Sequence, residues 1–465
     1  MSTTAEQIEQ FRATIRGSVI GRDDAAYDEA RALYNAMIDK RPFLIVQCRD
    51  VADVISAVNF AREHGLEVAI LGGGHNGPGL GSVNDGLVID LSLMNGVRVD
   101  SQAKTVRVEG GCTWADVDHA THAFGMATPS GIVSTTGVGG LTLGGGVGNI
   151  TRQYGLTIDN LLEVDVVLAD GRFLTANAEQ NEDLFWAVRG GGGNFGVVTS
   201  FLFKLHPVGI VYGGPLFFEM ADAAKVMRFW HEFIMDAPED FNAYFGFHTV
   251  PPADMFPAEH HLKKIGVVVC CYTGELSKGE EAVRPFREVA TPIIDFVGPI
   301  PFPMLQGLFD GLYPPGLQWY WNADFVVSLS DEAIELHLEH FAQSPTVHSA
   351  MHLYPINGAA HNVGRNDTAW NFREANFVQV IVGVDPDPAN KEAITTWSKS
   401  YWQALHPHSA GGAYVNMMME EGQDRIQAAY RENYDRLATI KAEYDPTNFF
   451  HINQNIKPGQ NSRAA

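Results

Sequence analysis

The chain has 465 residues but only four cysteines, and it contains no long apolar run. The cysteines are Cys48, Cys112 and the adjacent pair Cys270-Cys271, which lie in apolar or glycine-rich stretches. Their spacing matches neither a zinc site nor a disulfide framework, so we predict buried free thiols and no metal site. Because no run of about 18 apolar residues occurs, the sequence predicts no membrane-spanning helix.

Basic residues are scarce as well. Lys and Arg number 32 against 55 Asp and Glu, which gives a net charge of −23. Such a chain offers no basic stripe to nucleic acid or to an anionic membrane, so we expect neither as a partner. The segment 1–7 has neither the basic nor the apolar part of a secretory signal. We therefore expect a cytoplasmic protein, a monomer or homodimer, that binds a small molecule.

Short strands and helices alternate in the first part of the chain. The expected strands cover residues 43–47, 66–71, 86–90, 105–109, 161–168 and 197–205. Several of these strands are joined by short turns, which favours an α+β fold over a pure doubly wound sheet.

A different pattern begins near Pro207 and continues to about residue 415. Its apolar segments predict strands of one antiparallel sheet at 216–219, 243–250, 266–272, 319–327, 349–356 and 377–384. Helices are expected between these strands at 331–341 and 390–404, and an amphipathic helix is expected at 424–441. We therefore predict domain boundaries near 207 and 415.

The most informative motif is Gly72-Gly73-Gly74-His75, which directly follows the apolar run 68–71. Glycines at the end of a strand let backbone N–H groups approach an anionic group, because no Cβ intervenes. A second tract, 137–148, holds too much glycine for a stable helix on propensity alone, at about 1 kcal/mol per glycine relative to alanine. Two such tracts indicate a large phosphate-bearing cofactor, with the His75 imidazole beside it.

A third glycine tract, 191–196, matches the pattern G-x-G-x-x-G of dinucleotide-binding proteins. Its context differs, because that pattern needs a strand before it and a helix after it. Here a predicted helix at 182–189 precedes the tract and a β-branched strand follows at 197–199. The tract is therefore either a structural tight turn or a turn that contacts the cofactor.

These motifs resemble the FAD-binding domain of the berberine-bridge-enzyme-like flavoproteins, in the vanillyl-alcohol oxidase or PCMH superfamily. The matching segments are 72–76, 131–148, 154–160, 183–199, 432–437 and 444–450. The resemblance covers nearly the whole chain and weakens in the middle. It implies a PCMH-type FAD-binding domain of two α+β subdomains (1–207). It also implies a substrate domain with an antiparallel sheet flanked by helices (208–415), and a C-terminal segment (416–465) that completes the FAD domain.

The family implies an FAD whose isoalloxazine 8α-methyl group is bonded to the histidine of the G-G-H motif, here His75. Many relatives carry a second link from a cysteine, and the matching position in this chain is Val133. Because valine cannot form that bond, we predict FAD attached through His75 only. Cys112 lies in another segment and is the alternative second anchor.

Two residues have predicted catalytic roles. Tyr414, in Tyr414-Val415-Asn416, matches the tyrosine of a Y-x-N motif in sugar-oxidising relatives. A phenol with a reference pKa of about 10 needs help to act as a base, so Tyr414 is either that base or a ring that shapes the site. Thr136 matches a position over the flavin's reactive carbon. Valine there accompanies oxygen use, and Thr136 has the shape of valine, which favours an oxidase.

The predicted cofactor contacts combine the glycine loops with amides near the C-terminus. They are Gly72, Gly73, Gly74, His75, Asn76, Gly77, Ser134, Thr135, Gly137, Gly139, Gly140, Gly144, Gly145, Gly196, Val197, Tyr414, Asn416, Asn453 and Asn455.

The predicted substrate contacts lie in the middle domain, where the family places its substrate cavity. They are Tyr320, Trp321, His352 and Tyr354, with ordinary core packing as the alternative. Alternation along a strand puts His352 and Tyr354 on one face, and Trp319 and Trp321 on one face. The segment 351–354 lacks the glutamate base that plant alkaloid-oxidising members carry there, which disfavours amine chemistry through a carboxylate.

We predict an FAD-dependent oxidase that transfers hydride from an alcohol carbon of a small organic substrate to FAD. The substrate would be a sugar, a secondary alcohol or a natural product, and O2 would reoxidise the cofactor to give H2O2. The alternatives are an amine or alkaloid oxidase of the hydroxynicotine type and a dehydrogenase that uses another electron acceptor. A flavin-free binding protein that retains the glycine loops is a further alternative, and a colourless folded protein would support it.

Overall fold

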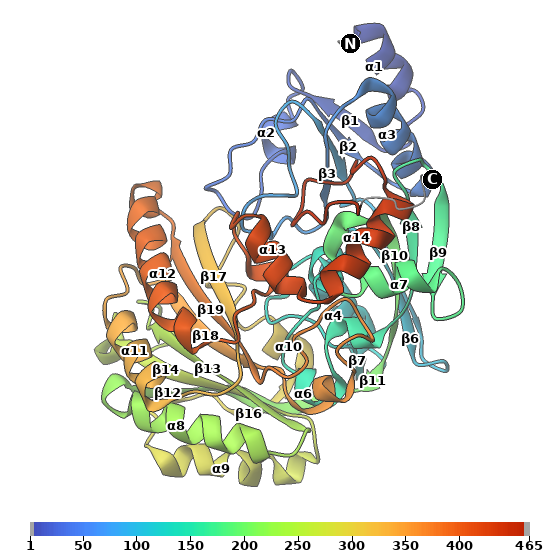
Figure 1. Cartoon of the computed structure of the whole chain (residues 1–465). Coiled ribbons are helices and arrows are strands. Elements are labelled where there is room, and N and C mark those ends of the chain that lie inside the picture. Colours follow the sequence, from blue (N-terminus) through green and yellow to red (C-terminus); the bar gives the residue numbers. More distant parts are fainter. Residues whose placement is uncertain (1–3, 460–465) are drawn as a thin grey trace.

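The computed structural model describes residues 4–459, which form three larger β-sheets surrounded by helices (Figure 1). The first sheet has the order β1 (Ser18–Gly21), β2 (Leu44–Gln47), β4 (Leu87–Asp90) and β3 (Val68–Leu71). Strands β2 and β3 run parallel to β4, and β1 is antiparallel to β2. Helices α1 (Ala5–Arg12), α2 (Tyr27–Ala30) and α3 (Val51–His64) accompany this sheet.

Local signals in the sequence account for the bounds of α3. The Asp50 side chain accepts hydrogen bonds from the N–H groups of Ala52 and Asp53, which caps the first turn. The helix ends at Gly65, whose φ of 63° suits a residue without a Cβ. The chain then enters β3, which carries residues 72–75 at its C-terminal end.

The second sheet is antiparallel and has five strands. Its order is β5 (Val97–Asp100), β6 (Thr105–Glu109), β10 (Val197–Lys204), β8 (Leu161–Val167) and β9 (Phe173–Asn177). Helices α4 (Trp114–His122), α5 (Val138–Leu143), α6 (Thr151–Tyr154) and α7 (Glu182–Val188) belong to the same region, as do the paired short strands β7 (Met126–Ala127) and β11 (His206–Pro207). The second glycine tract thus forms a short helix despite its poor propensity, because Val138, Thr142 and Leu143 are buried.

The third sheet has eight strands and is antiparallel. Its order is β15 (Ile294–Asp295), β12 (Ile210–Glu219), β14 (Lys264–Tyr272), β13 (Phe241–Thr249), β18 (Ala350–Pro355), β19 (Phe377–Asp385) and β17 (Gln318–Val326), with β16 (Gly298–Pro301) paired to β12. The short helix α10 (Phe302–Gln306) leads into the segment 307–317 that precedes β17.

Four helices cover one face of this third sheet. They are α8 (Met220–Asp236), α9 (Gly279–Val289), α11 (Asp331–Ala342) and α12 (Lys391–Leu405), which lie on its outer side in Figure 1. Trp230, Phe245 and Phe377 form part of the core between these helices and the sheet. Tyr244 and Trp319 belong to a separate core on the opposite face.

The C-terminal region returns to the second sheet. Helix α14 (Asn433–Tyr444) lies beside α7 in Figure 1, and α13 (Gln423–Tyr430) packs against α14. The buried ammonium group of Lys441 donates hydrogen bonds to the Asp445 carboxylate at 2.6 Å and to the carbonyls of Asn194 and Phe450. These bonds hold the last segment against the turn at 192–194.

The predicted α+β fold is confirmed, and the segments predicted for one antiparallel sheet all lie in the eight-stranded sheet. The four cysteines are free and buried, as predicted. Strands β1, β5 and β9 were not predicted, because they are short and half-exposed or lie beside turns. The domain boundaries near 207 and 415 stay predictions. Within residues 4–459, no helix is long and apolar enough to cross a membrane.

Candidate active site

A large cavity lies between the glycine-rich tracts and the face of the third sheet opposite α8, α9, α11 and α12. The tracts contribute Gly72–Asn76 and several residues between Gly131 and Val147 to its lining, and β17, β18 and β19 contribute the opposite wall. Segments from the C-terminal region, including 414–417 and 452–454, line a further side. The third glycine tract also reaches the cavity through Gly192 and Gly196. Its helix-before, strand-after context is as predicted.

The two main glycine tracts touch each other through their backbones. A Cβ on Gly73 would lie 2.3 Å from the Gly137 nitrogen, and a Cβ on Gly137 would lie 2.3 Å from the Gly73 nitrogen. Neither position therefore accepts a side chain. Within residues 4–459, the backbone N–H groups of residues 73–76 donate to no protein acceptor. A loop of free N–H groups that border a cavity is a ready site for an anionic ligand.

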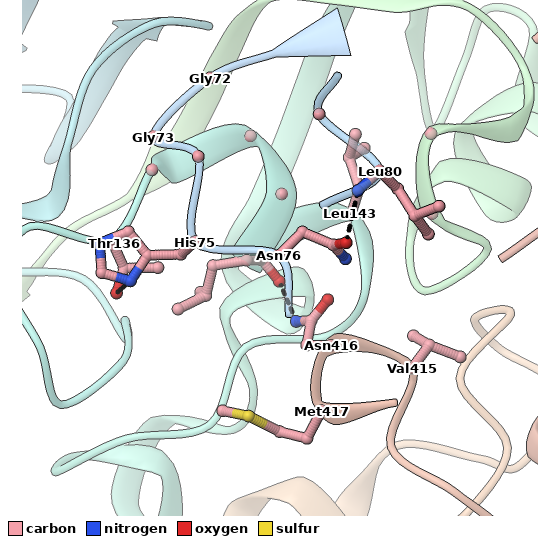
Figure 2. A pocket seen from close by; sticks show the side chains of 18 of the residues that line it. Gly72, Gly73, His75, Asn76, Leu80, Thr136, Leu143, Val415, Asn416 and Met417 are labelled. Carbon is pink, nitrogen blue, oxygen red and sulfur yellow. Dashed lines mark hydrogen bonds between the residues drawn. The ribbon is translucent and has the colours of Figure 1, made fainter. Parts of the chain in front are cut away.

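His75 stands at the end of this loop with both ring nitrogens beside hydroxyl groups. Its Nε2 lies 3.1 Å from the Thr135 hydroxyl and its Nδ1 lies 3.5 Å from the Thr136 hydroxyl. Figure 2 shows the His75 ring next to Thr136. The His75 ring also stacks on the Tyr34 ring, and the two ring centroids lie 3.8 Å apart. Burial lowers the pKa of His75 to about 4, so the imidazole is neutral at neutral pH and keeps a free nitrogen lone pair.

The position that matches a second anchor in relatives lies on the same cavity. Val133 lines it, and valine has no group that bonds a cofactor. The alternative anchor, Cys112, is fully buried in the core of the second sheet, and its thiol donates to the Gly96 carbonyl. Burial raises the pKa of the Cys112 thiol to about 12, which keeps it protonated and unreactive.

Tyr414 and Asn416 lie together at one end of the lining. The Tyr414 hydroxyl oxygen accepts hydrogen bonds from the Gly146 N–H at 2.9 Å and from the Asn416 amide at 3.0 Å. The Asn416 amide also donates to the Leu141 carbonyl, and Figure 2 shows it below the glycine-rich helix. Burial raises the pKa of Tyr414 to about 12 despite these two donors. The phenol is therefore protonated at neutral pH and can donate its own hydrogen to a ligand.

Buried acceptors on the C-terminal side lack protein partners. Asn453 donates to the carbonyls of Gly193 and Phe450, but its side-chain oxygen and the Tyr430 hydroxyl have no partner among the described residues. Both residues line the cavity. Unpaired buried polar atoms are costly, so these groups are suited to a ligand that brings hydrogen-bonding groups of its own.

Aromatic side chains dominate the wall on the third sheet. Trp319 and Trp321 of β17 share a face, as predicted, and their rings lie 5.7 Å apart. Tyr354 and His352 of β18 share the same cavity face, as alternation predicts. Valines from β19 complete this wall.

Tyr320, which the sequence predicts as a substrate contact, does not line this cavity. Successive residues of a strand point to opposite faces, so Tyr320 faces α12, where Lys399 lies 5.2 Å from its ring centre. Trp319 takes the place that we assigned to Tyr320, because it shares the cavity face with Trp321.

Several predicted cofactor residues support the cavity without lining it. Gly77 leaves room for the Trp321 ring, and Gly144 leaves room for the Asn416 side chain. Thr135 contacts His75, and Ser134 donates its N–H and hydroxyl to the Asp310 carboxylate. The remaining residues outside the lining are Gly145, Val197 and Asn455. Adjacent residues of a tight loop or strand cannot all face one side, which is why a contiguous motif overpredicts contacts.

Sequence reasoning missed contacts that are distant from the motifs. Tyr34 stacks on His75, and its hydroxyl donates to the Tyr313 carbonyl at 2.6 Å. Phe309 and Tyr313, from the segment before β17, also line the cavity. Nothing local marks these aromatic residues as site residues, because any buried aromatic has the same pattern.

The cavity lining carries no full charge among the residues that the structure describes. It includes no Asp, Glu, Lys or Arg side chain. The same part of the chain also contains no group of three or more His, Cys, Asp or Glu that would hold a metal ion. An organic ligand must therefore be held by backbone N–H groups, hydroxyls, amides and aromatic rings.

These features fit FAD. The free N–H groups of residues 73–76 suit its diphosphate, and the neutral His75 imidazole lies on the cavity surface. The unpaired Asn453 oxygen and the Tyr414 hydroxyl suit the hydrogen-bonding edges of a flavin or ribose.

Comparison with known proteins agrees with this geometry. Residues 42–177 match the family described as FAD binding domain, and residues 413–457 match the family described as berberine and berberine like. An FAD-linked oxidoreductase from Dictyostelium discoideum is 33% identical, over 98% of this chain and 97% of its own length. (R)-6-hydroxynicotine oxidase from Paenarthrobacter nicotinovorans is 28% identical, over 96% and 97%.

A solved structure has the same fold. The crystal structure of 6-hydroxy-D-nicotine oxidase from Arthrobacter nicotinovorans superposes with a TM-score of 0.86, at 24% identity, over 96% of this chain and 98% of that one. The likeness extends over nearly the full length of the chain, so it includes the glycine tracts, the loop that carries His75 and the C-terminal segment. The chain therefore belongs to the berberine-bridge-enzyme-like family and is an FAD-linked oxidoreductase.

Proposed function

We propose that the enzyme is an oxidase that carries FAD bonded to His75 alone. It oxidises the hydroxyl-bearing carbon of a small, uncharged organic molecule. O2 is the final electron acceptor, and H2O2 is the product. The observation that carries this proposal is the neutral His75 imidazole on the cavity surface, with Val133 on the same lining and Cys112 buried elsewhere.

The cofactor, when bound, supplies a two-electron acceptor for the hydride that leaves the substrate carbon. The chain's own residues hold it and place the substrate. The N–H groups of residues 73–76 would hold the diphosphate, and a nitrogen of His75 would form the covalent bond. Asn416 and the unpaired side-chain oxygen of Asn453 would bind polar edges of the cofactor.

The substrate side supports an uncharged substrate. Its wall consists of indole, phenol and valine side chains, with no carboxylate to pair with an ammonium group among the described lining residues. Oxidation of an alcohol releases one hydride and one proton, so the site needs a proton acceptor and no counter-ion. A secondary alcohol or natural product with a flat apolar body suits this wall better than a sugar, whose many hydroxyls would need more polar partners.

Thr136 supports the use of oxygen. Its short side chain lines the cavity beside His75 and leaves the space that a leucine or isoleucine would fill. A dehydrogenase with another electron acceptor is the alternative, and it predicts slow reoxidation in air.

An amine oxidase is the second candidate function. It is favoured by the 28% identity to (R)-6-hydroxynicotine oxidase over nearly the full length of both chains. An amine can lose hydride as a neutral base without a carboxylate partner, so an uncharged wall is compatible with it.

Two measurements test the proposal. The absorption spectrum of native protein and of acid-precipitated protein reports on the cofactor, and we expect a yellow pellet. A panel of alcohols and cyclic amines, with peroxide detection, then reports on the substrate class. Turnover of cyclic amines alone would replace the alcohol proposal with the second candidate, and a colourless folded protein would remove the flavoenzyme proposal altogether.

A further inference from the structure

Three buried polar side chains form a continuous hydrogen-bonded chain on the substrate side of the cavity. The Tyr354 hydroxyl is hydrogen-bonded to Nδ1 of His352, and Nε2 of His352 lies 2.7 Å from Nε2 of His248. Tyr354 and His352 belong to β18 and line the cavity, whereas His248 belongs to the neighbouring strand β13. The hydrogen-bonded chain therefore leads from the cavity lining across the face of the sheet to a buried histidine outside the lining.

The sheet register builds this arrangement. Gly246 pairs with His352 across the two strands, and a Cβ on Gly246 would lie 2.8 Å from the His352 ring. The glycine thus leaves the space that the imidazole occupies. His248 lies two residues further along β13 and so points to the same face as Gly246.

The hydrogen-bond chain allows proton transfer from Tyr354 to His248 in one arrangement of its hydrogens. An N···N contact between two neutral imidazoles needs one nitrogen to donate and the other to accept. If Tyr354 donates to Nδ1 of His352, then Nε2 of His352 carries a proton and donates to His248. A proton that arrives at the tyrosine oxygen is then passed along two bonds and arrives on His248.

The surroundings of the chain hold it uncharged at rest. Phenols face it from two elements, Tyr244 of β13 and Tyr313 of the segment before β17, and Phe309 packs on both imidazoles. Burial lowers the pKa of His248 to about 4 and that of His352 well below its usual range. Burial also raises the pKa of Tyr354 well above that of a free phenol. The histidines are therefore unprotonated and able to accept.

Tyr414, another tyrosine of the cavity lining, differs in this respect. The Tyr414 oxygen accepts two hydrogen bonds, from Gly146 and Asn416, and no base lies behind it in the described structure. Tyr414 can orient a ligand, but it has no residue to which it can pass a proton.

We propose that Tyr354 is the catalytic residue that takes the substrate hydroxyl proton, and that His352 and His248 are positioning residues that receive it. This inference rests on the proposed alcohol oxidation. It goes beyond that proposal by replacing Tyr414, our sequence-based candidate, as the proton acceptor.

The electrons and protons of the step balance. The substrate O–H bond breaks and its proton bonds to the Tyr354 oxygen, while the tyrosine's own proton moves to Nδ1 of His352. The proton on Nε2 of His352 moves to Nε2 of His248, which becomes an imidazolium. The O–H electron pair forms the second carbon–oxygen bond, and the hydrogen on carbon leaves with its electron pair to the oxidised cofactor. The alcohol is oxidised by two electrons and the cofactor is reduced by two.

The test uses a phenol that binds but has no carbinol hydrogen to transfer. 4-Fluorophenol is added to the oxidised holoenzyme, and the fluorine NMR shift of the bound form is followed against pH to read its ionisation. In the wild-type protein the chain accepts the phenol proton. In Tyr354→Phe and His352→Gln this acceptor is lost, so the bound phenol should ionise at least one pH unit higher, a tenfold shift in the equilibrium.

Matched controls make this outcome specific. His337 and Tyr401 form a second buried pair, with Nδ1 of His337 2.8 Å from the Tyr401 hydroxyl, in the core on the helix-covered face. His337→Gln should leave the ionisation at its wild-type pH. Thermal melting shows which variants fold. If His352→Gln does not fold, the ionisation measured in Tyr354→Phe, which removes only a hydroxyl, tests the inference.

Two results would overturn the inference. One is that bound 4-fluorophenol ionises at the wild-type pH in folded Tyr354→Phe, whether or not Tyr414→Phe raises that pH instead. The other is a lack of saturable binding of 4-fluorophenol to the wild-type cavity. Because the titration needs no turnover and no covalent cofactor bond, its failure is separable from failure of the proposed oxidase function, which the colour and substrate panel report.

Discussion

The two walls of the cavity are built by different means. The wall at 72–76 presents free backbone N–H groups to the cavity, and its glycines pack against those of the tract at 131–148. The wall on the third sheet presents side chains from β17, β18 and β19, which are separate segments of the sequence. A backbone wall is confined to short segments and suits a cofactor common to a family. A side-chain wall depends on which residues the sheet register brings together, and it determines the substrate.

The two walls meet at His75 and Tyr34. The His75 ring stacks on Tyr34, which packs against Trp319 at a centroid distance of 5.4 Å. Trp319 in turn contacts Tyr313, and Tyr313 packs against Phe309. A continuous aromatic surface therefore connects the proposed cofactor anchor to the proposed proton-accepting chain.

The largest expected effect concerns the cofactor wall. His75→Ala should give a colourless pellet on acid precipitation with all the yellow colour in the supernatant, because we propose His75 as the single residue that bonds the cofactor. Cys112→Ala is the matched control and should keep a yellow pellet. A yellow pellet from His75→Ala would mean that a second residue forms a bond.

The next effect concerns the substrate wall. Tyr354→Phe should slow cofactor reduction by an alcohol substrate by about 10²–10⁴-fold, the usual contribution of a positioned acid or base. Stopped-flow bleaching under nitrogen measures this rate. Tyr414→Phe should cost less, since Tyr414 only orients a ligand. Equal losses in both variants would contradict the difference that we assign to the two tyrosines.

The pH dependence should follow the histidines of the substrate wall. The lowered pKa of His248, about 4, means that this residue is neutral and able to accept above that pH and protonated below it. We therefore expect kcat/KM to be flat above about pH 5 and to fall about tenfold per unit below pH 4. Rapid pH-jump assays, with a check of folding by circular dichroism, measure this profile. A fall in kcat/KM near neutral pH would instead indicate a proton acceptor with an ordinary imidazole pKa.

A smaller effect should come from Thr136, the residue that we propose controls the access of oxygen to the cofactor. Thr136→Leu fills the space beside His75 and should slow reoxidation of the bleached enzyme by air on the order of tenfold, ~1.4 kcal/mol of barrier. Thr136→Val keeps the shape and should reoxidise at the wild-type rate. Equal rates in all three proteins would show that this position does not control oxygen access.

The smallest effects distinguish neighbouring residues of β17. Trp319→Leu should raise KM several-fold, because a lost aromatic contact is worth about 0.5–1.5 kcal/mol. Tyr320→Leu should change KM less than about twofold, since its ring lies on the other face beside Lys399. Steady-state assays of both variants measure the contrast. A larger change in Tyr320→Leu would mean that the face assignment of this strand is wrong.

The sequence by itself determined the cofactor wall. The glycine spacing, His75 after β3, and the absence of a cysteine at Val133 are local features, and backbone conformation at such positions depends mainly on residue type. The alternation of apolar residues likewise predicted the six main strands of the antiparallel sheet and the shared face of His352 and Tyr354.

Only the tertiary structure decided the rest. The partnership of His352 with His248 requires the pairing of β13 with β18, which joins residues 104 positions apart in the chain. The stacking of Tyr34 on His75, and the position of Tyr320 outside the cavity, likewise depend on how strands and loops from distant segments pack. Strand register and long-range packing set which side chains meet, and one residue of displacement along a strand turns every side chain to the other face.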